Sequence, residues 1–403
     1  MSRLFTIDRE QLPAEQRRFF DAVKAIRRRP ISGPFIVLMN SSPDLAARFA
    51  HLGHYFHSRG QADESILSLR VRALVALLGA RALDAPYEWS AWVGWALEAG
   101  VPPDTVDAIR ERRTPPSLTT EDALVLDFCA QLMTDGHRVD DATYQAALGH
   151  FGVRGLVELV MSLGYFAMIA FPLNAFEMEM SPGQQALRKP YAPLVVAPNS
   201  DRSGDGREAP SFARREADRL NSRIPLIARH ADLQAEHQHF FDRIVRTRGH
   251  VSRVFQVLLN SPDVADRVAN VGAFLLYDTI LPPRISILVW LITARELDCH
   301  YAWIAGVSDA LEAGLPQGLI DAILRGSPPA AVSEEHGVVF AFCHQLLRGN
   351  HHVGEMTYSA AVARFGVAVT VQIAATLGYF AMLACVLNAF EVEPDADASR
   401  PAM

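Results

Sequence analysis

Apolar residues recur at helical spacing along most of this chain. From Ile66 to Asp84, and again from Ile280 to Asp298, they return every three or four positions, as on the buried face of a helix. Sustained alternation of apolar and polar residues is scarce, and so are the dipeptides that favour β-hairpins. The pattern therefore predicts an all-α protein.

The same pattern occurs twice. The segment from Leu163 to Met168 returns as Leu377 to Met382, 214 residues later. Nearer the N-terminus the offset is 219, because the first copy holds about five extra residues between Gly53 and Glu64. A tandem duplication predicts two helical-bundle repeats, at residues 1–180 and 211–394. The stretch 181–210 is rich in proline, glycine, serine and charge, which indicates a flexible linker.

Helix boundaries are marked alike in both copies. Gly100 is followed by Pro102, and Gly314 by Pro316, a spacing typical of one helix ending and the next beginning. Thr119 and Ser333 precede acidic residues and an apolar period, as N-caps do. Each copy ends in a long helix with almost no charge. The stretch 367–390 is long enough to span a membrane but contains polar residues, so we expect a buried helix and no membrane partner.

Composition describes a soluble globular protein. Half of the 403 residues are hydrophobic, 21% are charged and the net charge is -7, which gives no electrostatic attraction to nucleic acid. The first residues lack the apolar core of a secretory signal, so a cytoplasmic location is expected. The four cysteines show no Cys-x-x-Cys pair or zinc-like spacing. We therefore expect no disulfide framework, no metal and no cofactor.

Several motifs, in this order, resemble those of the carboxymuconolactone decarboxylase family. They are Leu281-Pro282-Pro283-Arg284, Tyr87-Glu88-Trp89, Asp141-Ala142-Thr143-Tyr144, Val157-Glu158-Leu159-Val160 and Gly164-Tyr165-Phe166. The resemblance covers nearly all of both copies. It implies the all-helical fold that this family shares with AhpD-type alkyl hydroperoxide reductases, here as two fused AhpD-like units. It also implies a homo-oligomer.

The catalytic positions of that family are altered here. Its first glutamate is replaced by Ala73 in one copy and Ile287 in the other, and its histidine by Trp92 and Gly306. Glu88 keeps the second glutamate in the first copy only. The complete proton relay implied by the resemblance is therefore absent from both copies.

Cys299 occupies the position of the first cysteine in the peroxidase branch. The second cysteine position, 302, holds alanine, so disulfide-based peroxide chemistry lacks its second step. His300 is adjacent, but neighbouring helical residues point about 100° apart. We expect Cys299 to contact substrate rather than to act as a peroxidase.

One helical face of the first copy carries the best candidates for chemistry. Glu88, Trp92 and Trp95 are four and three residues apart, so they should line one surface. A carboxylate beside indoles is partly desolvated, which raises its pKa and suits acid-base catalysis near neutral pH. Glu88 is the first catalytic candidate, with both tryptophans as substrate contacts. The alternative is a vestigial helix residue.

The equivalent face of the second copy is Ala302, Gly306 and Asp309. The loss of two indoles predicts a larger cavity there. Asp309 supplies a carboxylate one turn further along, and it is the second catalytic candidate.

Three histidines, His51, His54 and His57, are spaced so that they could gather on one side of a helix. None has a histidine counterpart in the second copy. A metal site is one interpretation, but helical histidines more often line surfaces or pockets. We take His54 as a further acid-base candidate and predict no metal site.

Two arginines and two tyrosines survive the duplication. Arg70 and Arg284 suit either a salt bridge between helices or a clamp for a substrate carboxylate. Tyr165 and Tyr379 suit either the core or a pocket wall. All four are kept as candidate substrate contacts.

These residues favour a cofactor-independent lyase or isomerase. It would act on a small carboxylated or carbonyl-bearing substrate, of the kind found in secondary-metabolite or aromatic-acid pathways, by side-chain acid-base chemistry. The alternative is a catalytically degenerate member of the family that serves as a binding or scaffold protein. A thiol peroxidase is the least favoured reading.

Overall fold

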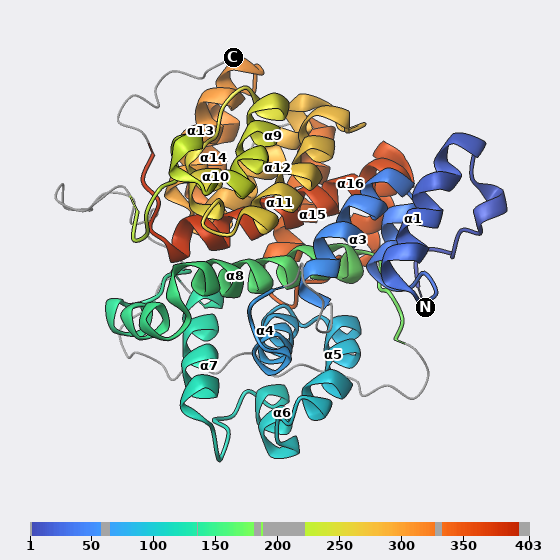
Figure 1. Cartoon of the computed structure of the whole chain (residues 1–403). Coiled ribbons are helices and arrows are strands. Elements are labelled where there is room, and N and C mark those ends of the chain that lie inside the picture. Colours follow the sequence, from blue (N-terminus) through green and yellow to red (C-terminus); the bar gives the residue numbers. More distant parts are fainter. Residues whose placement is uncertain are drawn as a thin grey trace.

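The computed structural model describes residues 2–57, 65–134, 136–180, 187, 222–326 and 333–394. Within these ranges the chain forms sixteen α-helices and no strand, which confirms the predicted all-α class (Figure 1). We refer to residues 2–180 as the first half and to residues 222–394 as the second half. Apart from Leu187, the predicted linker 181–210 lies outside the described residues.

The two halves contain the same eight helices in the same order. In the first half these are α1 (Arg17–Arg27), α2 (Pro34–Met39), α3 (Pro43–His57), α4 (Leu69–Ala82), α5 (Pro86–Glu98), α6 (Pro103–Arg110), α7 (Thr120–Met133) and α8 (Asp141–Ala175). In the second they are α9 (Gln238–Arg248), α10 (Arg253–Leu258), α11 (Pro262–Ala273), α12 (Pro283–Glu296), α13 (His300–Glu312), α14 (Gln317–Arg325), α15 (Glu334–Leu347) and α16 (Glu355–Ala389). A π-helical turn, Phe274–Asp278, extends α11.

Helix boundaries follow the local signals in the sequence. The side chain of Thr119 accepts a hydrogen bond from the backbone N–H of Asp122 and caps α7, and Ser333 caps α15 in the same way through His336. Gly100 and Gly314 adopt positive φ angles of 80° and 76° directly after α5 and α13. Glycine takes that conformation without the steric penalty that a Cβ atom brings, so both helices end there.

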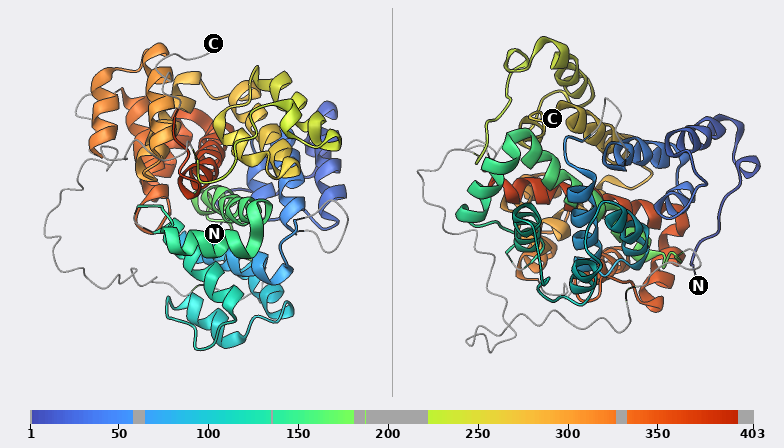
Figure 2. Two further views of the ribbon diagram at one scale, coloured as in Figure 1. Left: turned by 60° about the vertical axis from the view of Figure 1, so that its left-hand side comes forward. Right: turned by 60° about the horizontal axis from the view of Figure 1, so that its bottom comes forward.

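The long helices α8 and α16 form the centre of the molecule and lie against each other (Figure 2). Each is kinked at a glycine with positive φ, at Gly152 (65°) and Gly366 (78°). Both helices are long and apolar enough to cross a membrane by length and composition. Their most apolar stretches are 100% and 89% buried inside the protein, in agreement with the predicted buried helix.

Two glycines let these central helices approach closely. A Cβ atom on Gly164 would lie 3.1 Å from the carbonyl oxygen of Met382, and one on Gly378 would lie 3.0 Å from the Cα atom of Met168. Each contact is the counterpart of the other, 214 residues away. The halves therefore meet around an approximate two-fold relation, as two subunits do in a symmetric dimer.

Reciprocal arginines hold the two halves together. The backbone N–H of Arg3 bonds to Phe176 in its own half, while its guanidinium donates to the carbonyl of Val353 in the other half at 3.0 Å. Arg223 repeats this arrangement, with its backbone on Phe390 and its guanidinium on Val139 at 2.8 Å. Each half thus anchors the start of the other half's long helix.

A second pair of reciprocal contacts lies at Glu158 of α8 and Gln372 of α16. The fully buried Glu158 accepts hydrogen bonds from Tyr55 at 2.8 Å and from Ser261 of the second half at 3.1 Å, and it is ion-paired with Arg154 at 3.0 Å. Gln372 donates to Ser41 of the first half at 3.1 Å. The halves therefore share a polar network inside one continuous apolar core.

Candidate functional site

Glu88 lies in the first turn of α5, whose N-terminus is set by Pro86. Its side chain is directed into the protein and the residue is only 4% exposed. Trp92, one turn later, is 2% exposed, and its ring lies 4.9 Å from that of the partly buried Trp95. The spacing of 88, 92 and 95 therefore brings a carboxyl and two indoles to the same side of the helix.

Glu88 is an unusual carboxyl. Its Oε2 atom is buried and has no hydrogen-bond partner among the described residues. Burial raises the pKa of Glu88 to about 8, against the opposing influence of the Arg27 charge. At neutral pH the group is therefore mostly a neutral acid that retains a proton to donate.

His57, the last residue of α3, shares this region. Its Nδ1 atom is 2.6 Å from the carbonyl oxygen of Gly53, and its ring lies 5.2 Å from Trp92 and 5.7 Å from Tyr165. The rings of Trp95, Tyr165 and Phe166 meet the imidazole edge-on, Phe166 at 5.9 Å. Burial lowers the pKa of His57 to about 4, so the imidazole is neutral at pH 7.

Tyr165 of α8 closes the cluster from the inside. Its hydroxyl rests against Gly53, where any side chain would collide with it. Burial raises the pKa of Tyr165, and the nearby Glu88 contributes in the same direction. The phenol therefore stays protonated. Tyr165 contacts the ring of His57 and lies near Glu88.

Arg27, at the end of α1, brings positive charge to the same region. Its guanidinium donates to the backbone and hydroxyl oxygens of Ser32 at 3.0 and 3.2 Å and lies 4.2 Å from the centre of the Phe35 ring. Arg29 lies 5.2 Å from the Trp95 ring. We call Arg27, His57, Glu88, Trp92, Trp95 and Tyr165 the Glu88 cluster.

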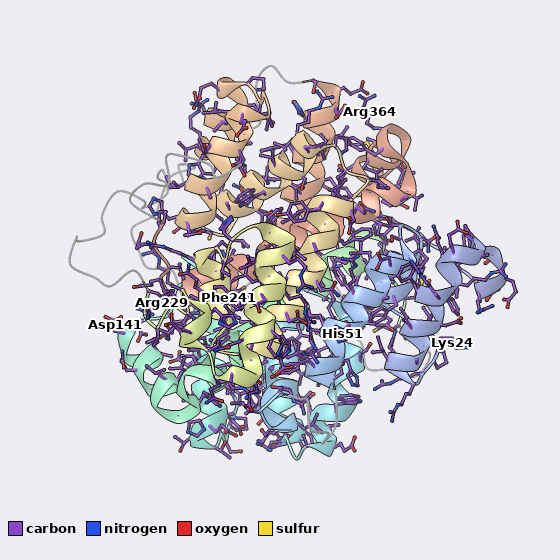
Figure 3. All side chains as sticks on the ribbon, turned by 45° about the horizontal axis from the view of Figure 1, so that its top comes forward. Lys24, His51, Asp141, Arg229, Phe241 and Arg364 are labelled. Atoms are coloured by element: carbon purple, nitrogen blue, oxygen red, sulfur yellow. The ribbon has the colours of Figure 1, made fainter. Side chains whose placement is uncertain are left out.

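The other two histidines lie elsewhere. His54 is exposed, and the structure does not bring it to the Glu88 cluster. His51 is on the side of α3 that faces the second half (Figure 3), where burial and then the charge of Arg267 lower its pKa. No group of histidine, cysteine or acidic residues that could hold a metal ion is found among the described residues.

The second half lacks this chemistry. Ala302, Gly306 and Leu276 stand where the first half has Glu88, Trp92 and His57. Tyr379 is retained and accepts a hydrogen bond from Arg248 at 3.3 Å. Asp309 is half-buried, which raises its pKa, and the charge of Glu312 acts in the same direction.

The larger cavity expected at Gly306 is not what the structure shows, and this expectation is corrected. Trp290 of α12 stacks on Phe380 at 5.3 Å with an angle of 9° between the rings. A Cβ atom on Gly306 would lie 3.4 Å from this indole. The space freed on α13 is therefore taken by a tryptophan from the neighbouring helix.

The remaining candidates occupy separate places. Arg70 is bound to Asp122 through two hydrogen bonds of 2.9 and 2.7 Å, which join α4 to α7. Arg284 is 59% exposed and lies 4.0 Å from Glu335. Cys299 is fully buried just before α13 and forms no disulfide. None of these three belongs to the Glu88 cluster.

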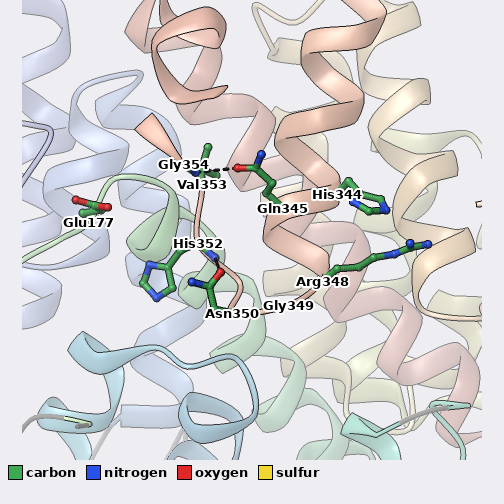
Figure 4. Close-up of a pocket in the computed structure, with 9 residues that line it drawn as sticks. All are labelled: Glu177, His344, Gln345, Arg348, Gly349, Asn350, His352, Val353 and Gly354. Carbon is green, nitrogen blue, oxygen red and sulfur yellow. Dashed lines mark hydrogen bonds between the residues drawn. The ribbon is translucent and has the colours of Figure 1, made fainter. Parts of the chain in front are cut away.

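Two pockets accompany these sites. An open polar depression of about 540 Å³ lies between Glu177 and the loop from Arg348 to Gly354 (Figure 4). A narrow apolar cavity of about 60 Å³ lies between the halves, next to His137 and His351. Neither pocket is lined by Glu88 or His57.

Signals in the sequence also mark two residues of the Glu88 cluster, His57 and Arg27, and the separate buried Glu158. His57 is four residues after Gly53, so a helix places its ring above a position without a side chain. Arg27 has a counterpart in Arg248, 221 residues later, as expected for a residue kept by the duplication. Glu158 differs between the copies, where it is replaced by Gln372.

Comparisons with protein-family models, curated proteins and solved structures found no match for this chain.

Proposed function

We propose that this protein is a cofactor-independent lyase or isomerase that transfers a proton on a small carboxylated or carbonyl-bearing substrate at the Glu88 cluster. The resemblance to the carboxymuconolactone decarboxylase family, with an AhpD-like unit in each half, is part of this proposal. The single observation that carries it is the buried Glu88 carboxyl with an unpartnered oxygen.

Such a group requires an explanation, because buried polar atoms in proteins nearly always have a partner. A structural carboxyl would normally be paired, as Glu158 is with Tyr55, Ser261 and Arg154. Glu88 instead combines an open hydrogen-bonding position with a pKa of about 8. Both properties suit a general acid that acts near neutral pH.

The chemistry follows from the neutral acid. A protonated Glu88 donates a hydrogen bond to a carbonyl or carboxyl oxygen of the substrate and stabilises the enol or enolate that forms when an adjacent C–H or C–C bond breaks. The indoles of Trp92 and Trp95 supply an apolar wall that excludes water from the acid.

The test measures exchange of carbon-bound hydrogen for deuterium. Phenylpyruvate, a carboxylated ketone, is incubated with the protein in D₂O, and the loss of its carbon-bound hydrogen is followed by NMR. We expect Glu88→Gln to lower the rate by about 100-fold or more, since it removes the proton but keeps the shape. Glu98→Gln, on the exposed side of α5, is the matched control and should retain the wild-type rate. A wild-type rate no faster than the uncatalysed reaction, or a fully active Glu88→Gln, would overturn the proposal.

The second candidate is a binding or scaffold protein. The observation in its favour is the close packing of His57, Trp92 and Phe166, whose rings fill the centre of the cluster. Under this alternative, Glu88 is a remnant of the ancestral relay. The exchange experiment separates the two, because a scaffold gives no rate that depends on Glu88.

A further inference from the structure

We infer that His57 is the second acid-base group of this site and that its Nε2 atom acts as the base while Glu88 acts as the acid. The inference rests on the proposed function and makes it more specific. It identifies a residue on a different helix, α3, and it narrows the reaction to a proton shift within the substrate.

The tautomer of His57 is set by its backbone contact. The carbonyl of Gly53 can only accept a hydrogen bond, so the Nδ1 atom at 2.6 Å carries the proton. In a neutral imidazole the Nε2 atom is then the unprotonated nitrogen, with its lone pair available. No described residue forms a hydrogen bond with it.

The surroundings keep this imidazole neutral. The rings of Trp92, Trp95, Tyr165 and Phe166 lie 5.2 to 6.1 Å from it. The charged groups that act on it are Arg27 and Arg29 at the end of α1 and Arg72 on α4, all of which disfavour a second positive charge. The neighbouring phenol of Tyr165 and the Glu88 carboxyl are uncharged at neutral pH.

Trp92 and Tyr165 connect His57 to Glu88. Trp92 is one turn from Glu88 along α5, and its ring is in contact with the His57 ring. Tyr165 contacts His57, and Glu88 is close enough to help raise the pKa of Tyr165. Two titratable groups whose environments favour opposite proton occupancies form an acid-base pair.

The proposed step is balanced. Nε2 of His57 takes a proton from the carbon next to the substrate carbonyl, the C–H electron pair forms a C=C bond, and Glu88 protonates the carbonyl oxygen to give the enol. The enol then returns its O–H proton to Glu88. The imidazolium delivers its proton to carbon, either to the original atom or to the far end of a conjugated double bond. Both side chains end as they began. Delivery to the original atom regenerates the substrate, whereas delivery to the far end of the double bond is an isomerisation.

The test uses His57→Asn in the phenylpyruvate exchange assay. An asparagine amide can still donate to the Gly53 carbonyl, so the variant keeps the structural contact and loses the base. We expect a loss of about 100-fold or more. We also expect the wild-type pH profile of kcat/KM to rise near pH 4 and to fall near pH 8. The limb near pH 4 should disappear from the residual activity of His57→Asn, and the limb near pH 8 from that of Glu88→Gln.

A merely structural histidine would not control one limb of the profile. Wild-type activity in His57→Asn, or residual activity that keeps the limb near pH 4, overturns the role of His57. If Glu88→Gln is inactive in that case, the proposed function stands. Loss of activity in His54→Asn, with His57→Asn still active, would assign the base to the exposed histidine instead. Full activity in Glu88→Gln refutes the proposed function itself.

Discussion

At Glu88, burial and an oxygen without a partner among the described residues act in the same direction, and both favour the neutral acid. His57 shows the opposite case, because burial there favours the neutral base. Both groups are neutral in the folded protein at neutral pH. In water Glu88 would be ionised at that pH, and His57 would become charged slightly below it. Folding therefore changes the proton affinity of both, and stability must depend on pH.

The pH dependence can be predicted with its sign. The folded-state pKa of Glu88, about 8, lies above its ordinary value of 4.5, so its contribution to stability is complete below pH 4.5 and is lost as the pH rises to 8. The folded-state pKa of His57, about 4, lies below 6.5, so its contribution is complete above pH 6.5 and is lost as the pH falls to 4. Between pH 4.5 and 6.5 the two slopes cancel.

Above pH 6.5 only the Glu88 effect remains. At about 1.4 kcal/mol per pH unit, the wild-type free energy of unfolding should fall by about 2 kcal/mol more than that of Glu88→Gln between pH 6.5 and 8. Urea denaturation followed by circular dichroism at several pH values measures this difference. Parallel curves for the two proteins would show that the Glu88 carboxyl is already ionised in the folded state.

The sequence predicts acidic, aromatic and histidine side chains for the site, but not which histidine is among them. The helical spacing of Glu88, Trp92 and Trp95 predicts their common face on α5, as the structure has it. Spacing alone does not distinguish His51, His54 and His57, and it is a long-range contact between α3 and α8 that places His57 beside Tyr165. The packing of Tyr165 against Gly53 determines which histidine faces the core. A contact between residues so far apart in sequence cannot be predicted from the spacing of apolar residues along one helix.

Among the helices, the two halves carry a large side chain on different members of one helix pair: on α5 in the pair α4 and α5, but on α12 in the pair α12 and α13. The first half has Trp92 on α5 and Ala76 at the α4 position equivalent to Trp290. The second half has Trp290 on α12, and it lies next to Gly306, the position equivalent to Trp92. In both halves an indole packs on the equivalent phenylalanine, at 5.0 Å in the first and 5.3 Å in the second. The face of each helix was predictable from the sequence, but the volume of the gap was not, since it depends on both helices.

The crossing of α8 and α16 gives a prediction at this scale. Gly378→Val should destabilise the protein by about 2–3 kcal/mol, because a side chain there meets the backbone of Met168 and forces the helices apart. Denaturation in urea measures the loss. Gly318→Ala on α14 is the control, since a Cβ atom there meets nothing within 4 Å, and it should stabilise the helix slightly. Equal stability of Gly378→Val and wild type would contradict the tight crossing.

Local signals predicted the starts and ends of helices well. Caps at Thr119 and Ser333 and breaks at Gly100 and Gly314 appear where the sequence placed them. The kinks at Gly152 and Gly366 and the π-helical turn after α11 were not foreseen. Glycine permits such a kink, but other helical glycines of the chain are not kinked, so the glycine alone does not predict it.

For the molecule as a whole, the duplicated sequence predicted two equivalent sets of helices but not their mutual arrangement. The reciprocal contacts of Arg3 and Arg223 connect residues far apart in sequence. They could not be predicted, because arginines in such segments are usually exposed to solvent. The halves share one core, so we expect them to unfold together.

Glu158 tests this coupling. Glu158→Ala leaves Tyr55, Arg154 and Ser261 without their shared acceptor and should lower the free energy of unfolding by about 3 kcal/mol. Gln372→Ala removes a neutral counterpart and should cost about 1–2 kcal/mol. Both variants should show a single transition in urea by fluorescence and by circular dichroism. Two separated transitions would show that the halves are independent.

The reciprocal contact between the halves also governs how this molecule can change. In a dimer of identical chains every substitution is made twice, so a mutation that removes an acid from one site removes it from the other. Here the first and second halves are separate parts of one chain, so a substitution changes only one of them. One half can therefore lose a buried acid such as Glu88 and still support the other half, which keeps the acid beside a neighbour that is always part of the same chain.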